Sequence, residues 1–240
     1  MRPLLTLLFI ALFAGLSAQN WGSGKRIKGN GDLVTKDRKV ASFSGIKTCC
    51  SFTVEVRKGA PSIRIEAESN LQEYISTDVS AGRLSIRFTR NLNISNHKPI
   101  RVYVTMNELD YLAASSSSRI IFRDGFKGDD LEVDVSSSAR VESLNFSGDE
   151  IRLEASSSGK IDIAGNGSRI RAKASSSGKI SASGCEVENA RVDVSSGAGI
   201  SLNVSGELDA EASSGGSVRY TGSPNVDSDT SSGGSVRKQQ

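Results

Sequence analysis

The second half of the chain repeats a short alternating apolar segment that ends in a cluster of serines. The clusters begin at Ser115, Ser136, Ser156, Ser175, Ser195, Ser213 and Ser231. Successive clusters therefore start 21, 20, 19, 20, 18 and 18 residues apart. A period this short and regular is typical of a solenoid, in which each repeat buries its apolar face only against its neighbours.

Each repeat is expected to contain short strands on either side of its serine cluster. Residues 151–155 and 170–174 alternate apolar and polar side chains, which indicates a strand with one buried face. A second strand follows the turn, as in residues 161–163, and residues 165–167 are expected to form a loop that returns the chain. An antiparallel sandwich is the alternative, but it would reverse the order of segments in neighbouring strands. The sequence therefore predicts an all-β fold, a single-stranded right-handed parallel β-helix of about 18–21 residues per coil.

Serine and glycine suit the corners of such coils. Glycine reaches positive φ without a steric penalty, and serine is a common turn residue. Stacked serine hydroxyls can both donate and accept, so they are expected to form a polar ladder along the corner.

The first residues have the layout of a cleaved secretory signal. A basic start at Arg2 precedes an apolar stretch over residues 4–16, and small residues follow at Ser17 and Ala18. That stretch is too short for a comfortable membrane span, and no later stretch is long and apolar enough for one. We therefore expect residues 1–18 to be a signal peptide and the remainder to be extracytoplasmic: periplasmic, at the cell surface or secreted.

The rest of the chain divides by regularity. Residues 19–36 are polar and glycine-rich and are predicted to be a flexible lead-in, whereas 37–238 form the β-helix domain. Within that domain, 37–112 are expected to be an irregular β part that covers one end, and 113–238 the Ser/Gly-rich coils.

The composition of the chain excludes some classes of binding partner. The formal net charge is only +3 and aromatic residues make up 5% of the chain, which argues against nucleic acid as a partner. The one histidine, His97, is expected to be solvated in a loop. Neither a metal site nor a cofactor is expected, because His97 has no second ligand at a suitable spacing.

Three cysteines follow the predicted signal peptide. Cys49 and Cys50 are adjacent on an expected strand, so their side chains should face opposite ways. All three are interpreted as small buried apolar residues. A disulfide from Cys185 to one of the pair remains open.

Stacking the repeats predicts columns of like-placed outward residues. One column should read Glu132, Arg152, Arg171, Arg191, Asp209 and Asp227, and its neighbour Asp134, Glu154, Lys173, Asp193, Glu211 and Asp229. Arg152, Arg171, Lys173 and Arg191 would then form a basic band, with an acidic zone beyond it. Stacked like charges are unfavourable, and an anionic ligand would relieve their repulsion. We interpret this basic band as a candidate site for an anionic ligand such as a glycan. A soluble face with partial pairing between coils is the alternative.

Several segments of the chain together resemble the head GIN domain family, secreted proteins described as autotransporter adhesins. They are residues 43–46, 52–56, 84–88, 100–104 and the Ser/Gly-rich coils, so that the resemblance runs from about residue 40 to 236. The resemblance implies a β-helical extracytoplasmic domain and implies no catalytic residues.

The leading hypothesis is an exported, non-enzymatic domain for adhesion or binding, with a glycan or a surface or matrix protein as partner. A structural or assembly module without a specific ligand is the first alternative. The second is a β-helix enzyme acting on polysaccharides, which would need clustered carboxylates such as Asp129, Asp130, Asp149 and Glu150. The Ser-x-x-Lys spacing at Ser157–Lys160 and Ser176–Lys179 fits some acyl-transfer enzymes, but the lysine would have to be buried.

Overall fold

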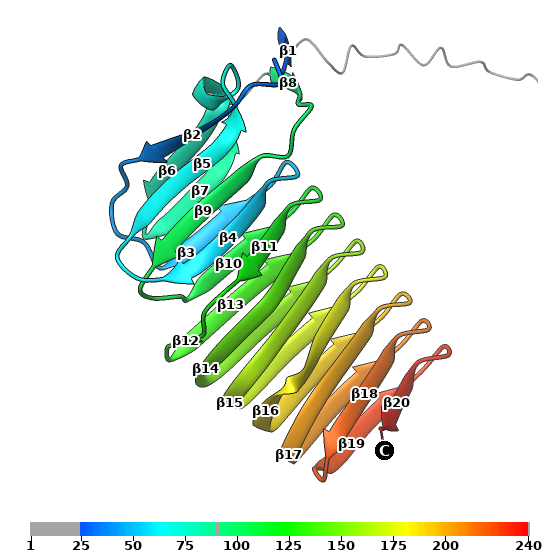
Figure 1. The fold of residues 1–240 in the computed structure, drawn as a ribbon. Helices are drawn as coiled ribbons and strands as arrows, with labels where there is room; N and C mark the ends of the chain where they lie inside the picture. Colours follow the sequence, from blue (N-terminus) through cyan, green and yellow to red (C-terminus); the bar gives the residue numbers. More distant parts are fainter. Residues whose placement is uncertain (1–24, 90–91, 240) are drawn as a thin grey trace, which may run out of the picture.

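The computed structural model describes residues 25–89 and 92–239, and the predicted signal peptide lies outside them. The described chain is almost entirely β, with a single short 3₁₀ turn, η1 (Gln72–Tyr74). Its strands stack into an elongated solenoid whose N-terminal end carries a less regular set of strands (Figure 1). The predicted fold class, a parallel β-helix with an irregular N-terminal part, is confirmed.

The regular coils are built from long, continuous strands. Each runs from one serine turn, around a bend, to the next turn. These strands are β14 (Arg140–Ala155), β15 (Lys160–Ala174), β16 (Lys179–Val194) and β17 (Gly199–Ala212). The loop predicted at residues 165–167 is therefore wrong, because Gly165 and Gly167 pair in parallel with Cys185 and Val187.

Shorter strands complete the stack on either side of these coils. They are β10 (Tyr111–Ala114), β11 (Arg119–Phe122), β12 (Phe126–Lys127), β13 (Asp130–Val135), β18 (Ser217–Gly222), β19 (Asn225–Thr230) and β20 (Ser235–Lys238). Neighbouring coils pair in parallel throughout, which gives the solenoid two long sheet faces joined by the serine turns and by the bends.

The core is a set of apolar columns that follow from this register. Leu131 pairs with Ile151, Ile151 with Ile170, and Ile170 with Ala190, and the side chains of the first three are fully buried. Parallel strands lie about 4.8 Å apart, so each buried residue packs directly on its counterparts in the next coils. The alternation seen in the sequence thus becomes a continuous core along the axis.

The serine turns are tight reversals with a left-handed backbone. In one of them Ser157 and Ser158 have φ of 47° and 63°, and the Gly159 N–H donates to the Ser156 carbonyl at 2.8 Å. Positive φ at both central residues with this hydrogen bond defines a type I′ turn. Such turns usually contain Asn or Gly, so serine here occupies a strained conformation.

The turns stack through their main chain. The Ser138 N–H donates to the Ser157 carbonyl and the Ser158 N–H to the Ser176 carbonyl, both at 3.0 Å. The same link recurs from Ser51 to Gly215 along the whole row of turns. The ladder that we predicted for serine hydroxyls is thus made by peptide groups, because the left-handed backbone turns the central peptide along the solenoid axis.

The N-terminal part inserts into the stack out of sequence order. Strands β3 (Gly45–Thr48) and β4 (Thr53–Lys58) pair in parallel with β10 and β11, and on their other side with β7 (Arg83–Phe88) and β9 (Arg101–Met106). Strands β5 (Ser62–Glu68) and β6 (Ile75–Ser80) then pair antiparallel with β9 and β7.

Two more strands lie in residues 19–36, where a flexible lead-in was predicted. Strand β2 (Leu33–Arg38) pairs antiparallel with β5, and β1 (Lys25–Lys28) pairs in parallel with β8 (Leu92–Ser95). Residues 25–28 and 33–36 are therefore paired strand rather than flexible, while residues 19–24 lie outside the described part.

The last coil differs from those before it. On β19 the inward positions are Val226, Ser228 and Thr230, where β17 has Leu208, Ala210 and Ala212. Every residue of β19 is exposed, whereas those three β17 residues are buried. Polar residues at core positions make this end of the described stack a poor surface for apolar packing.

Candidate functional site

The basic band lies on one sheet face, in the predicted columns. Arg152 pairs with Arg171, and Arg171 with Arg191, in the parallel register of β14, β15 and β16. Lys173 lies two residues beyond Arg171 on the same strand and is aligned with Glu154 and Asp193. The arrangement of the columns is confirmed, and anion binding by the band remains a prediction.

One carboxylate, that of Glu150, pairs with both arginines in the first half of the band and offsets half of their charge. Glu150, whose side chain is 18% exposed, places Oε1 2.9 Å from Arg152 Nη2 and 3.3 Å from Arg171 Nε. One partly buried carboxylate therefore holds two arginines from neighbouring coils. An incoming anion would have to compete with Glu150 for these two arginines, although one carboxylate offsets only one of their two positive charges.

The second half of the band is also paired, at longer distances. Lys173 Nζ lies 3.7 Å from Asp193 Oδ2, and Arg191 lies 3.6 Å from Asp209 Oδ2 and 3.8 Å from Glu211 Oε1. These side chains are well exposed, so each pair contributes little to stability. Together the contacts make the band a set of ion pairs, all but Arg152–Glu150 between neighbouring coils.

The surface beside the band is acidic. A hollow of about 380 Å³ runs along the solenoid next to the serine turns. Its charged lining residues are Glu154, Lys173, Asp193, Glu211 and Asp229, and the first serine of each turn completes the wall. Four carboxylates against one ammonium make this hollow unsuited to an anion.

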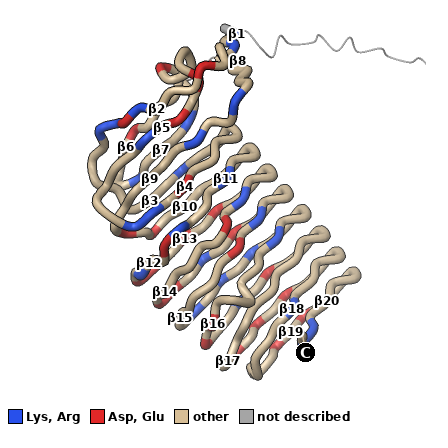
Figure 2. Tube along the Cα trace, in the orientation of Figure 1, with Lys and Arg blue, Asp and Glu red and all other residues tan. Residues whose placement is uncertain are grey.

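The opposite sheet face carries a second column of cations that our sequence analysis missed. Arg119 pairs with Arg140, Arg140 with Lys160, and Lys160 with Lys179, in four successive coils. We call these four residues the basic row. Figure 2 shows basic residues in successive coils beside the turns, on the face that carries β4 and β11. The signal was present in the sequence, because each of the four directly precedes the Ile or Val that follows a serine turn.

The basic row is far less neutralised than the basic band. Arg119 Nε lies 3.3 Å from Glu142 Oε1. Among the described residues, Arg140, Lys160 and Lys179 have no carboxylate oxygen within 4.0 Å, and all three are exposed. Three neighbouring cations therefore face solvent without a protein partner.

Two hollows adjoin along this face. One, of about 200 Å³, is lined by Arg140, Lys160 and Lys179 together with Glu142, Asp162 and Ser181. The other, of about 620 Å³, continues toward the C-terminal coils. Lys179 and Ser181 line both, so the hollows form one continuous groove.

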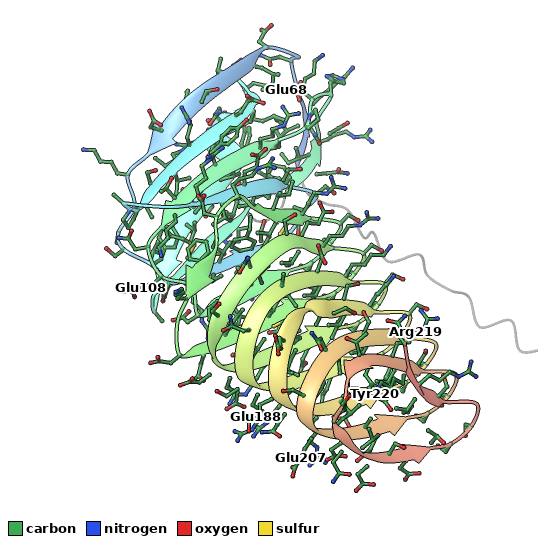
Figure 3. The ribbon with its side chains drawn as sticks, turned by 60° about the horizontal axis from the view of Figure 1, so that its bottom comes forward. Glu68, Glu108, Glu188, Glu207, Arg219 and Tyr220 are labelled. Atoms are coloured by element: carbon green, nitrogen blue, oxygen red, sulfur yellow. A yellow bond between two sulfur atoms is a disulfide. The ribbon has the colours of Figure 1, made fainter. Side chains whose placement is uncertain are left out.

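A buried carboxylate organises the N-terminal end. Glu68, labelled in Figure 3, is fully buried and accepts hydrogen bonds from the N–H groups of Gly31 at 2.6 Å, His97 at 2.9 Å and Lys98 at 3.4 Å. Burial alone raises the pKa of Glu68, but these N–H groups favour the ionised form and hold that pKa below its ordinary value. Gly29 is required here, since a Cβ would collide with the carboxylate. The site therefore joins two loops to the end of β5.

His97 belongs to this structural cluster. Its Nδ1 lies 3.4 Å from Glu68 Oε1, and its side chain is 46% exposed. The prediction of a solvated loop histidine is thus only half right. Within the described residues no group of three or more His, Cys, Asp or Glu side chains is arranged to hold a metal ion.

The cysteines differ from the sequence-based expectation. Cys49 and Cys50 form a disulfide with each other and lie in the first turn of the stack, where Cys50 has a φ of 66°. The expectation that they face opposite ways on a strand was wrong, because the strand ends at Thr48. Cys185 is a free thiol, buried in the core at the bend of β16, and burial raises its pKa to about 11.

The other candidate chemistry finds no support in the geometry. Lys160 and Lys179 are exposed strand residues, as expected, and thus lack the burial that acyl-transfer chemistry requires. Asp149 lies exposed at the bend, and Glu150 is occupied with the band arginines. In the part of the chain that the structure describes, no helix is long and apolar enough to cross a membrane.

Together these features define a class of protein: an elongated parallel β-solenoid whose exposed side chains repeat once per coil. The family comparison is more specific. Residues 42–224 match the family model described as "Putative auto-transporter adhesin, head GIN domain". The chain belongs to this head GIN domain family, as its sequence features suggested. Among curated proteins, none matches this chain.

Solved structures share the fold at low sequence identity. A "putative adhesin" from Bacteroides fragilis is 17% identical, with a TM-score of 0.82 over 89% of this chain and 100% of that one. A "putative adhesin" from Parabacteroides merdae has a TM-score of 0.72 at 24% identity, over 90% of this chain and all of that one. A "putative lipid binding protein" from Parabacteroides distasonis has a TM-score of 0.74 at 23% identity, with the same coverage.

Proposed function

We propose that this protein is a non-enzymatic binding module that acts in adhesion outside the cytoplasm, at the cell envelope or beyond it. The observation that carries the proposal is the repeated exposed surface of the solenoid, in a chain that belongs to a family described as adhesins. A surface whose positions repeat once per coil distributes the contacts with a partner over many equivalent positions. Such a surface suits a partner that is itself repetitive or extended, such as a glycan or a matrix protein.

The assembly alternative is less well supported. Packing of copies against the last described coil through apolar contacts is disfavoured, because the inward positions of β19 include Ser228 and Thr230. A polysaccharide-cleaving enzyme would need carboxylates gathered around a cleft. The four carboxylates of the acidic hollow instead stand in a line along the axis, interrupted by Lys173, and among the described residues that line it no two carboxylates face each other across it.

Binding of the purified protein to an array of glycans and matrix proteins tests the proposal. Each hit is repeated at high salt and with Arg152, Arg171, Lys173 and Arg191 changed to serine. Saturable binding to one class of partner, without shortening of any polymer, is the expected result. A blank across the whole array, or measurable polymer cleavage, would overturn the proposal.

Export is a separate part of the proposal. The protein recovered from its own cells should begin near Gln19, outside the cytoplasmic fraction. Mass spectrometry of the intact N-terminus after cell fractionation measures both. Full-length protein in the cytoplasm would contradict this location.

A further inference from the structure

We infer that the basic row and the groove beside it bind a linear acidic polysaccharide that lies along the solenoid axis. This inference rests on the proposed binding function and gives it a site and a ligand class. The ligand is recognised by carboxylate or sulfate groups that recur along an extended chain. The basic band on the opposite face is then not the main anion site.

Free charge is the first argument. The four cations of the band all lie within 4.0 Å of a carboxylate, whereas Arg140, Lys160 and Lys179 have none that close among the described residues. Stacking three like charges about 4.8 Å apart is unfavourable without a counterion. A polyanion aligned with the row would supply one anionic group per coil and remove that repulsion.

The width of the row argues for a single chain. Glu142 and Asp162 line the same hollow as the cations, two residues further along their strands. A flat anionic membrane would lie over these carboxylates and be repelled by them. A narrow polymer can contact the cations alone, and the strands of a DNA duplex would wind away from a straight row after one or two contacts.

Hydroxyl groups favour a sugar polymer. Beyond Lys179 the groove is lined by Ser181, Ser201 and Ser217, and it ends near Arg219, which Figure 3 labels on a C-terminal coil. Serine hydroxyls donate and accept, as sugar hydroxyls require. The five coils from Arg140 to Ser217 span about 19 Å at the usual strand spacing, enough for several sugar residues.

The column of the basic row continues at Gly199, where the structure has room for a side chain. Lys179 pairs with Gly199, and Gly199 with Ser217. A Cβ at Gly199 would approach only the Ser217 carbonyl oxygen, at 4.0 Å, and the φ of Gly199 is not in the left-handed region. A side chain can therefore be added here without disturbing the fold.

The first experiment removes charge from each face in turn. Polygalacturonate serves as the acidic probe and dextran as the neutral one. The test variant is R140S/K160S/K179S, and the matched control R152S/R171S/R191S removes the same charge from the band. Serine is compatible with the row, because Ser217 and Ser235 continue the same column. We expect the test variant to lose at least tenfold in affinity for polygalacturonate and the control less than threefold.

The second experiment adds charge at Gly199. We expect G199K to extend the row and raise affinity severalfold, and G199E to lower it by a similar factor. A gain of affinity cannot come from a damaged fold, and circular dichroism with an unfolding curve checks every variant. Equal losses in the two triple variants, or no change at Gly199, would overturn the inference.

The outcomes separate the ligand class from the proposed function. Tighter binding to duplex DNA or to vesicles of anionic lipid than to polygalacturonate would overturn the assignment to an acidic polysaccharide. Binding to a neutral glycan or a matrix protein that the row variants leave intact would overturn this site while leaving the binding function. Failure with every partner would overturn both.

Discussion

The loss in the free energy of unfolding that a core substitution causes should depend on where its coil lies along the solenoid axis, because each coil packs only on its neighbours. Ile170 and Val226 occupy the same inward column, but Ile170 is fully buried whereas Val226 is 36% exposed in the last coil. Ile170→Ala removes three carbons, worth about 2.4 kcal/mol at about 0.8 kcal/mol each. Its neighbour in the next coil is Ala190, which cannot fill the void. With the cavity included we expect a loss of about 3–4 kcal/mol in the free energy of unfolding.

Val226→Ala is the matched control. It removes two methyl groups that are already partly in water and leaves no enclosed cavity, so its cost should stay near or below 1 kcal/mol. Urea unfolding followed by far-UV circular dichroism measures both variants. The dependence of the unfolding free energy on urea concentration must be the same in both variants before their midpoints are compared, because solenoids can unfold in parts. If Ile170→Ala costs no more than Val226→Ala, the continuous core described above is not what stabilises the stack.

Three further predictions concern a turn, the buried carboxylate and the free thiol. Ser158→Gly should stabilise the protein by up to about 1 kcal/mol and Ser158→Val should destabilise it, because φ is 63° there; unfolding midpoints measure both, and the opposite order would contradict the turn geometry. Glu68→Gln should cost about 1–3 kcal/mol at neutral pH through its lost charged hydrogen bonds. Because the folded pKa of Glu68 is lowered, its contribution is present above the unfolded pKa and is lost as pH falls through the folded pKa; a pH-independent difference between wild type and variant would contradict this. Cys185 should be unreactive toward a thiol reagent in the folded protein and give one titratable thiol after unfolding without reductant, and three thiols there would rule out the Cys49–Cys50 disulfide.

Much of the regular part could be predicted because, in a parallel solenoid, aligning the repeats in the sequence gives the residues that pair in neighbouring coils. Once residues 151–155 and 170–174 are taken as equivalent, the columns of Arg152 and Lys173 follow, and the structure has them as predicted. The strand pairing of the irregular N-terminal part could not be predicted, because its strands pair with partners that are distant in the sequence. Strand β2 pairs with β5 and β1 with β8, and no pattern within 19–36 specifies partners so far along the chain.

The site was harder to predict than the fold. Column positions show which charges are neighbours, but they do not show which are neutralised, since Glu150 reaches two arginines from the bend. The basic row was visible in the sequence as a cation before the apolar residue that follows each turn. It was overlooked because the outward columns were aligned only for the strands before the turns, and not for the strands after them, where Lys160 stacks on Lys179.

The serine turns link every coil to the next by one peptide hydrogen bond, and each coil also adds one row of side chains to each sheet face. The solenoid can therefore become longer or shorter by whole coils. Removing residues 156–174, from one serine turn to the start of the next, would delete one coil and leave the flanking turns able to rejoin in register. Adding or removing a repeat would thus change the length of the exposed surface without changing the side chains of the remaining coils.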